Sequence, residues 1–151
     1  NEYLEEKFPE PALLPKGAEA RARARGITRF HDLYLEPPLR ALFPQVTGAA
    51  PKDPKLIEDK LAELKLRLDQ IEGKIDGPYA SGAQFTLADC ALIPTFFFMN
   101  VVPPMLGAPG PFEGRPKLGA WWAKVQERPT VQKVLAEQQQ ALVALQQQGR
   151  R

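Results

Sequence analysis

Apolar residues recur at helical spacing along most of the chain, and this pattern predicts helices. The clearest example covers positions 56–75, where apolar residues alternate spacings of four and three. These residues are Ile57, Leu61, Leu64, Leu68, Ile71 and Ile75. A coiled coil would show the same heptads, but the shorter helical patterns on either side favour a helix inside a bundle.

Four further segments show helical patterns, and proline or glycine separates them. A long helix is predicted at 18–36, ended or kinked by Pro37 and Pro38, with a further turn at 39–43. Others are predicted around 87–99, at 116–127 and from Thr130 onward. Segments 46–54 and 100–114 are rich in proline and glycine and are predicted to be loops. No strand-like alternation appears, so we expect an all-α bundle of about five helices plus a short N-terminal helix.

The stretch 82–93 carries a helix start signal. Thr86 is a good N-cap residue, and Asp89 lies three positions later, the spacing of a capping box. Phe85 and Cys90 are spaced to form the accompanying hydrophobic staple. Residues 91–99 are apolar around nearly the whole helix, which is typical of a helix in the centre of a bundle. We therefore interpret Thr86 and Asp89 as a buried structural cap and not as an acid–base pair.

Composition removes several classes of function. Twenty basic and 18 acidic residues give a net charge of +2, which provides no argument for nucleic acid or a membrane surface. The longest apolar run, 91–106, is interrupted by prolines and an asparagine, so no membrane span is expected. One cysteine and one histidine exclude a metal site rich in these residues. The single cysteine also agrees with a reducing, cytoplasmic compartment.

Few side chains are candidates for chemistry. Cys90 is interpreted as a small core residue in preference to a nucleophile. Arg21, Arg23 and Arg25 form a basic cluster near the start of the first long helix, which is either a solvated face or a contact surface. Trp121 and Trp122 are adjacent, so they point about 100° apart on a helix, and we expect one in the core and the other partly exposed.

The string Gly82-x-x-Phe85-Thr86-x-Ala88-Asp89, followed by Arg115-Pro116-Lys117-Leu118-x-x-Trp121, resembles the helical C-terminal domain of the cytosolic glutathione transferases. In that family the first motif caps the central helix and guides folding. Residues 2–9 resemble the last helix of the family's N-terminal thioredoxin-like domain. The resemblance therefore implies that 1–15 is the tail of that domain with a linker, and that 16–151 is the helical domain.

The resemblance implies that the parent protein conjugates glutathione to hydrophobic electrophiles in detoxification and forms a cytoplasmic homodimer. The family's activating residue and most glutathione contacts lie in the N-terminal domain, so we expect no catalytic residue here and no activity of the chain alone. The first long helix of the family lines the pocket for the second substrate. Positions matching that helix are Gly26, Phe30 and Tyr34. His31 is either a further substrate contact or, as we favour, a hydrogen-bonded core histidine.

Two other functions stay open at this stage. One is glutathione-dependent isomerisation of a maleyl-type acid, because Leu13-Leu14-Pro15 and Pro38-Leu39 are loosely similar to those enzymes. Arginines lining the pocket would favour this function. The other is a non-catalytic interaction module, since domains resembling this one also occur in translation and scaffolding proteins.

Overall fold

The structure is a computed structural model that describes residues 2–148, and these residues form an all-α bundle, as the sequence predicts. No β-strand occurs among them; one isolated antiparallel bridge joins Tyr79 and Gly82. In chain order the helices are α1 (Glu2–Lys7), α2 (Ala18–Phe30), the π-helix η1 (His31–Leu35), α3 (Glu36–Thr47), α4 (Pro54–Glu72), α5 (Leu87–Met99), α6 (Val102–Met105), α7 (Pro116–Val125) and α8 (Pro129–Gln148).

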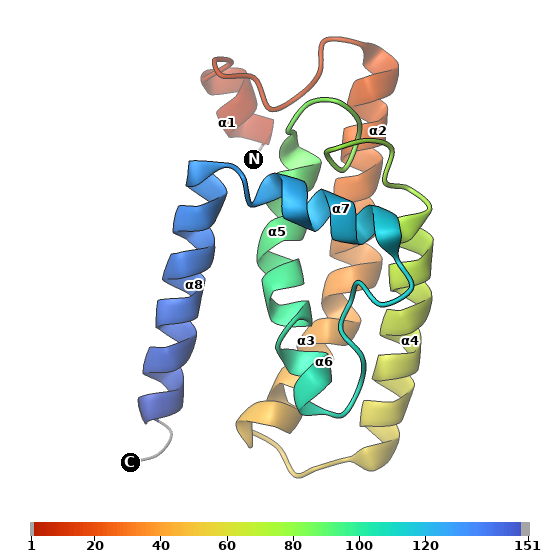
Figure 1. The fold of residues 1–151 in the computed structure, drawn as a ribbon, viewed down its shortest axis with the longest axis vertical. Coiled ribbons are helices and arrows are strands. Elements are labelled where there is room, and N and C mark those ends of the chain that lie inside the picture. The colour runs from red at the N-terminus through yellow and green to blue at the C-terminus, as the bar shows by residue number, and fades with distance from the viewer. Residues whose placement is uncertain (1, 149–151) are drawn as a thin grey trace.

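Helix α5 is the centre of the bundle. It packs against α2, α7 and α8, and Figure 1 shows it between α8 on one side and α4 on the other, with α7 crossing in front. Eight of its residues are buried and the other five are half-buried, so none is exposed; the buried ones are Leu87, Ala88, Asp89, Leu92, Ile93, Thr95, Phe96 and Met99. The apolar composition of this segment therefore predicted its central place correctly.

The chain does not leave the helical path at Pro37 and Pro38. Both prolines lie in the first turn of α3, which continues directly from the π-helix η1; because proline has no amide hydrogen, neither can bond back to a carbonyl of the preceding turn. The π-helix η1 precedes them, and its end is marked by the amide of Glu36 donating to the carbonyl of His31. Where one turn was expected at 39–43, α3 therefore extends from Glu36 to Thr47.

The π-turn also changes which side chains face the core. A π-turn holds more residues per turn than an α-helix, so it rotates the residues that follow. Leu35 is fully buried, whereas Tyr34 is 42% exposed. Ala24, Ile27 and His31 are also buried, so the buried face of α2 and η1 continues through Leu35 and leaves Tyr34 outside the core.

Two smaller differences concern the ends of elements. Helix α4 begins at Pro54, and the side chain of Asp53 caps it by accepting from the amides of Lys55 and Leu56. The predicted loop 100–114 contains the four-residue helix α6. Both starts use proline in the first turn, a position where its missing amide costs nothing.

The N-terminal segment is held in place although α1 has no buried residue. The Glu5 carboxylate accepts from the amides of Leu13 and Leu14 at 2.8–3.0 Å. The carbonyl of Leu13 in turn accepts from the amide of Leu87 at 3.0 Å, at the start of α5. Arg25 of α2 makes two hydrogen bonds to Glu2, which lower the pKa of that carboxyl.

One segment, Leu87–Met105, is long and apolar enough to cross a membrane by length and composition alone. It covers α5 and α6, and 56% of its most apolar window is buried inside the protein. The core helix of a bundle passes the same test, so this is weak evidence for a membrane span.

Candidate functional site

Three of the four residues predicted to bind substrate lie together on one flank of α2 and η1. The Phe30 and Tyr34 rings are 5.3 Å apart between centroids. A cation covers each ring: Lys74 Nζ, in the turn after α4, lies 5.3 Å from the Phe30 centroid, and the guanidinium carbon of Arg67 in α4 lies 5.0 Å from that of Tyr34. These contacts bring the aromatic pair beside α4 and the turn that follows it.

Gly26, one turn before Phe30 on α2, lines a cleft of its own. A side chain added at Gly26 would meet no atom within 4 Å. The cleft beside it has a volume of about 360 Å³ and is lined by three cations, one each from α2, the turn after α4 and α7, together with other residues of that turn. The cations are Arg23, Lys74 and Lys117. Arg23 forms an ion pair with Asp76, and Lys117 Nζ donates to the carbonyl of Ile75 at 3.3 Å, so two of them have protein partners.

His31 points into the core. It is only 8% exposed, and its Nε2 lies 2.6 Å from the Thr95 hydroxyl of α5. Its Nδ1 lies 2.9 Å from a carboxylate oxygen of Asp32. Both ring nitrogens therefore have protein partners, which supports the interpretation of His31 as a core histidine.

The capping box at the start of α5 is present and is part of a larger buried network. The amide of Thr86 donates to Asp89 Oδ2 at 2.8 Å, and the Thr86 hydroxyl accepts from the amide of Ala88 at 3.3 Å. The other oxygen of Asp89 accepts from the amide of Ala80 and from Trp121 Nε1, both at 2.8 Å. Asp89 is fully buried, so one carboxylate joins α5, α7 and the turn before α5.

Cys90 has the properties of a structural residue. Burial, with a smaller effect of neighbouring Asp89, raises the pKa of its thiol to about 11. At neutral pH very little thiolate is present, and thiolate is the nucleophilic form. The Phe85 ring instead contacts Tyr79 edge-on at 5.7 Å and lies 4.3 Å from the Arg128 guanidinium carbon. The Phe85–Cys90 staple stays a prediction.

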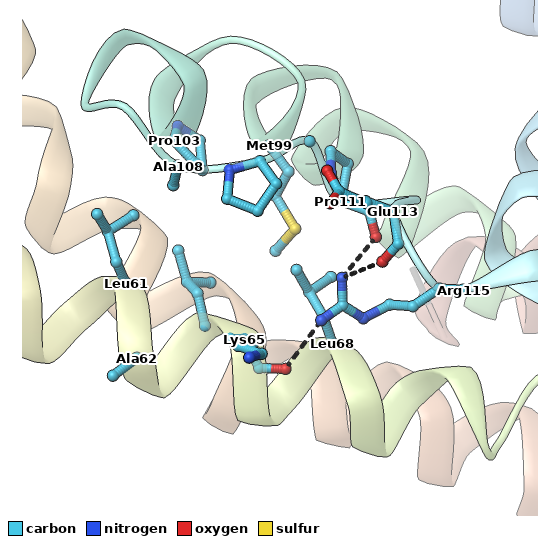
Figure 2. A pocket seen from close by; sticks show the side chains of 13 residues that line it. Leu61, Ala62, Lys65, Leu68, Met99, Pro103, Ala108, Pro111, Glu113 and Arg115 are labelled. Atoms are coloured by element: carbon cyan, nitrogen blue, oxygen red, sulfur yellow. Dashed lines mark hydrogen bonds between the residues drawn. The ribbon is translucent and has the colours of Figure 1, made fainter.

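Sequence reasoning missed a cavity on another face of α4, which Figure 2 shows from close by. Its volume is about 360 Å³, and its lining is mainly apolar. The walls come from α4, the end of α5, α6 and the loop 107–115; they include Leu61, Leu64, Leu68, Met99, Pro103 and Pro111. The signal in the sequence is the cluster of prolines between 103 and 116, which predicts a loop but not a cavity beneath it.

Arg115 fixes the loop that closes this cavity. Its Nε and Nη2 contact Asp69 at 2.9 and 2.7 Å. Nη1 donates to the carbonyls of Pro111 and Glu113 at 3.2 Å each, and Nη2 also donates to the carbonyl of Lys65. All donors of this 7% exposed guanidinium are used within the protein, so Arg115 has a structural role.

Comparison with known proteins assigns the family. Residues 30–129 match the family described as "Glutathione S-transferase, C-terminal domain", which is more than half of the chain. The chain belongs to the glutathione S-transferase family. It is 30% identical over 147 residues to glutathione S-transferase F6 of Arabidopsis thaliana, covering 89% of this chain and 65% of that protein. The chain thus spans just under two thirds of that relative.

Two solved structures agree with this assignment. Glutathione transferase F2 of Populus trichocarpa superposes with a TM-score of 0.75 at 22% identity, covering 93% of this chain and 67% of that one. Maleylacetoacetate isomerase of Anaeromyxobacter dehalogenans, described with dicarboxyethyl glutathione and citrate in the active site, gives a TM-score of 0.69 at 27% identity over 87% of this chain and 58% of its own. The glutathione S-transferase fold of this chain is therefore supported by both sequence and structure.

Two arginines of α2 bond to the N-terminal segment of this glutathione S-transferase chain: Arg25 bonds Glu2, and Arg21 donates to the carbonyl of Pro15 at 2.7 Å. Within residues 2–148, no three His, Cys, Asp or Glu side chains are grouped to hold a metal ion.

Proposed function

We propose that this chain is the second-substrate half of a glutathione transferase, which conjugates glutathione to hydrophobic electrophiles when a glutathione-binding domain packs against α1. The observation that carries this proposal is the bare apolar surface of α1. Tyr3, Leu4 and Phe8 are 69%, 54% and 62% exposed, although Glu2 and Glu5 hold α1 in one position. A helix that is held in place but leaves its apolar face uncovered is typical of a surface that packs against another domain.

The chain's contribution to the reaction is to bind and orient the electrophile. Gly26, Phe30 and Tyr34 form an accessible strip that is partly aromatic, and aromatic faces bind flat apolar groups well. Holding an electrophile beside a bound thiolate makes the reaction effectively unimolecular, which is a large source of rate enhancement. In this proposal glutathione supplies the nucleophile, and residues outside this chain bind and activate it.

The described residues support an external source of thiol activation. His31 is hydrogen-bonded to the Thr95 hydroxyl, and the Ser81 hydroxyl is hydrogen-bonded to that of Thr86. The pKa of the Cys90 thiol is raised. None of the three lies beside the aromatic strip as an available base or nucleophile. We therefore expect the chain alone to show no turnover.

The test compares the chain alone with a fusion that places the glutathione-binding domain of a relative before Asn1. Conjugation to a chlorodinitrobenzene electrophile is followed by absorbance. The proposal predicts turnover by the fusion and none by the chain. Turnover by the chain alone, or an inert fusion that is folded and still binds glutathione, would contradict it.

Isomerisation of a maleyl-type acid is the second candidate, favoured by the similarity to the isomerase that holds dicarboxyethyl glutathione and citrate. A dicarboxylate needs free cations, and Lys74 beside Phe30 is the best placed. Conjugation is preferred because Arg23 and Arg25 are already paired with carboxylates. The same fusion assayed with a maleyl-type acid distinguishes the two activities. If the fusion shows neither activity, the remaining candidate function is a non-catalytic interaction module.

We also propose that the parent protein is a homodimer. Leu33 of η1 and Leu66 of α4 are 45% and 51% exposed. They directly precede Tyr34 and Arg67 in the sequence, and the side chains of these two residues are in contact. Apolar side chains exposed on two neighbouring helices fit a self-complementary interface. Light scattering after gel filtration should give the dimer mass for the fusion and the monomer mass for Leu66→Arg. A monomeric unsubstituted fusion would exclude the dimer.

A further inference from the structure

We propose that the cleft beside the linker between α1 and α2 binds phosphate monoesters that carry a short aliphatic group. The cleft has a volume of about 570 Å³. This inference does not depend on the proposed function. It rests on two cations that line the cleft and on a buried donor of one of them that has no acceptor in the protein.

Three segments of the chain meet at this cleft. The linker contributes residues 11–14 and Lys16, the turn before α5 contributes Tyr79, Gln84 and Phe85, and Arg128 lies between α7 and α8. Figure 1 shows the linker and the turn before α5 at the same end of the bundle. The carbonyl of Leu13 accepts from the amide of Leu87 at 3.0 Å, so the linker wall is tied to the start of α5.

The Arg128 guanidinium is held in place but lacks an acceptor. Its carbon lies 4.3 Å from the centroid of the Phe85 ring, so the aromatic face covers one side of the cation. Its Nε is buried and has no hydrogen-bond partner within residues 2–148. Nearly all buried donors in proteins have a partner, and an exception calls for an explanation. An anionic ligand that bonds the guanidinium provides one, because arginine is suited to recognising phosphate and carboxylate groups.

Lys16 brings a second positive charge to the same cleft. The described lining contains no aspartate or glutamate, and the described residues form no ion pair with either cation. The Tyr79 hydroxyl and the Gln84 amide add neutral donors. A phosphate monoester matches this lining, because it carries a charge of about −1.5 to −2 at pH 7 and three strong acceptor oxygens. A carboxylate would leave one of the two positive charges unbalanced.

The apolar part of the lining selects the group to which the phosphate is attached. Pro11, Ala12 and Leu13 form an aliphatic wall of the cleft. The cleft is larger than a phosphate group needs, so there is space along this wall for the organic part of an ester. Burial of a few CH₂ groups there adds to the affinity. The site should therefore prefer a short alkyl phosphate to inorganic phosphate.

The three tyrosines of the chain provide a local test. Tyr79 lines the cleft, whereas Tyr3 belongs to α1 and Tyr34 to η1. The chain labelled with ¹³C in the tyrosine rings is titrated with n-butyl phosphate at constant ionic strength. Saturable binding at millimolar concentrations should shift the Tyr79 signals and leave the other two sets in place. Tyr3→Phe and Tyr34→Phe assign the signals, since each removes one set.

Two related anions test the class of ligand. n-Butyl sulfate has nearly the same shape as n-butyl phosphate but carries a single charge, and inorganic phosphate has the charge without the alkyl group. Both should bind severalfold more weakly than n-butyl phosphate. Equal affinity for either anion would contradict the assignment of the site to phosphate monoesters.

Matched variants locate the anion. Arg128→Gln should weaken binding about tenfold or more, because hydrogen bonds to charged groups are the strong ones. Lys16→Gln should weaken it severalfold, and this side chain is exposed, so its removal should not disturb the fold. Arg29→Gln and Lys52→Gln alter exposed positions outside the cleft and should not change the affinity. Tyr79 signals that do not move, or undiminished binding to Lys16→Gln or to folded Arg128→Gln, would overturn the proposal.

Discussion

At the scale of single residues, Asp89 is a fully buried carboxylate that joins α5, α7 and the turn before α5. Its two oxygens accept hydrogen bonds from the Thr86 and Ala80 amides, the Thr86 hydroxyl and the Trp121 indole. Each buried donor that loses its acceptor costs about 1–3 kcal/mol. The capping-box spacing predicted the bonds to Thr86, but Ala80 and Trp121 are too far from the motif for its spacing to reveal their roles.

Replacement of Asp89 should therefore be severe. We expect Asp89→Ala to lower the free energy of unfolding by about 3–5 kcal/mol, because several buried donors lose their partner at once. Urea denaturation followed by far-UV circular dichroism measures the change. Asp59→Ala is the control: this exposed aspartate pairs only with Lys55, and its loss should cost less than about 1 kcal/mol. Equal effects of the two substitutions would contradict the role given to Asp89.

The Cys90 thiol should react slowly in the folded chain. A pKa of about 11 in place of the ordinary 9.0 reduces the thiolate fraction at pH 8 roughly a hundredfold. Alkylation by iodoacetamide, quantified by mass spectrometry, should be slow in buffer and fast in urea, and Cys90→Ser should abolish it. Because burial favours the neutral thiol, its contribution to stability is complete below pH 9 and is lost as pH rises toward 11. Equal rates in buffer and in urea would show that the thiol is accessible and ionised.

At the scale of elements, the predictable helices are those with strong local signals. The heptad pattern of α4 predicts its buried face, where Leu64, Leu68 and Ile71 lie. In α7, Trp121 is buried and Trp122 is half-buried, as their adjacent positions predict. The π-helix η1 was not predictable, because proline spacing alone does not show that one turn widens while the chain stays helical. The cavity was not predictable either, since residues 61–68 and 99–115 meet only in the folded chain.

The loop 107–115 should become more mobile when Arg115 is replaced by lysine. Lysine is a single point donor and cannot reproduce the fork that bonds Asp69 and three carbonyls. We expect Arg115→Lys to lower the free energy of unfolding by about 1–3 kcal/mol. Hydrogen exchange should also become faster at loop amides such as Ala108 and Glu113. Arg29→Lys, on an exposed position of α2, should change neither quantity, and an unaltered loop in Arg115→Lys would contradict its role as a clamp.

At the scale of the whole molecule, one bundle presents two different surfaces. The apolar face of α1 is the proposed contact with a glutathione-binding domain, and the strip on α2 and η1 is the proposed wall for the second substrate. The family and the all-α fold followed from the sequence because the motif at 82–89 lies at the start of the central helix. The position of Tyr34 depended on the π-turn and needed the structure.

The most direct test of the account is the kinetic effect of Tyr34→Ala in the fusion with a glutathione-binding domain. Tyr34 is 42% exposed, so its truncation should leave the fold intact, and Leu145→Ala at a 65% exposed position of α8 is the matched control. If the strip orients the second substrate, Tyr34→Ala raises the KM for the electrophile severalfold and leaves the KM for glutathione unchanged. An unchanged KM for the electrophile, or an equal rise for both substrates, would contradict the assignment of this chain as the second-substrate half of the enzyme.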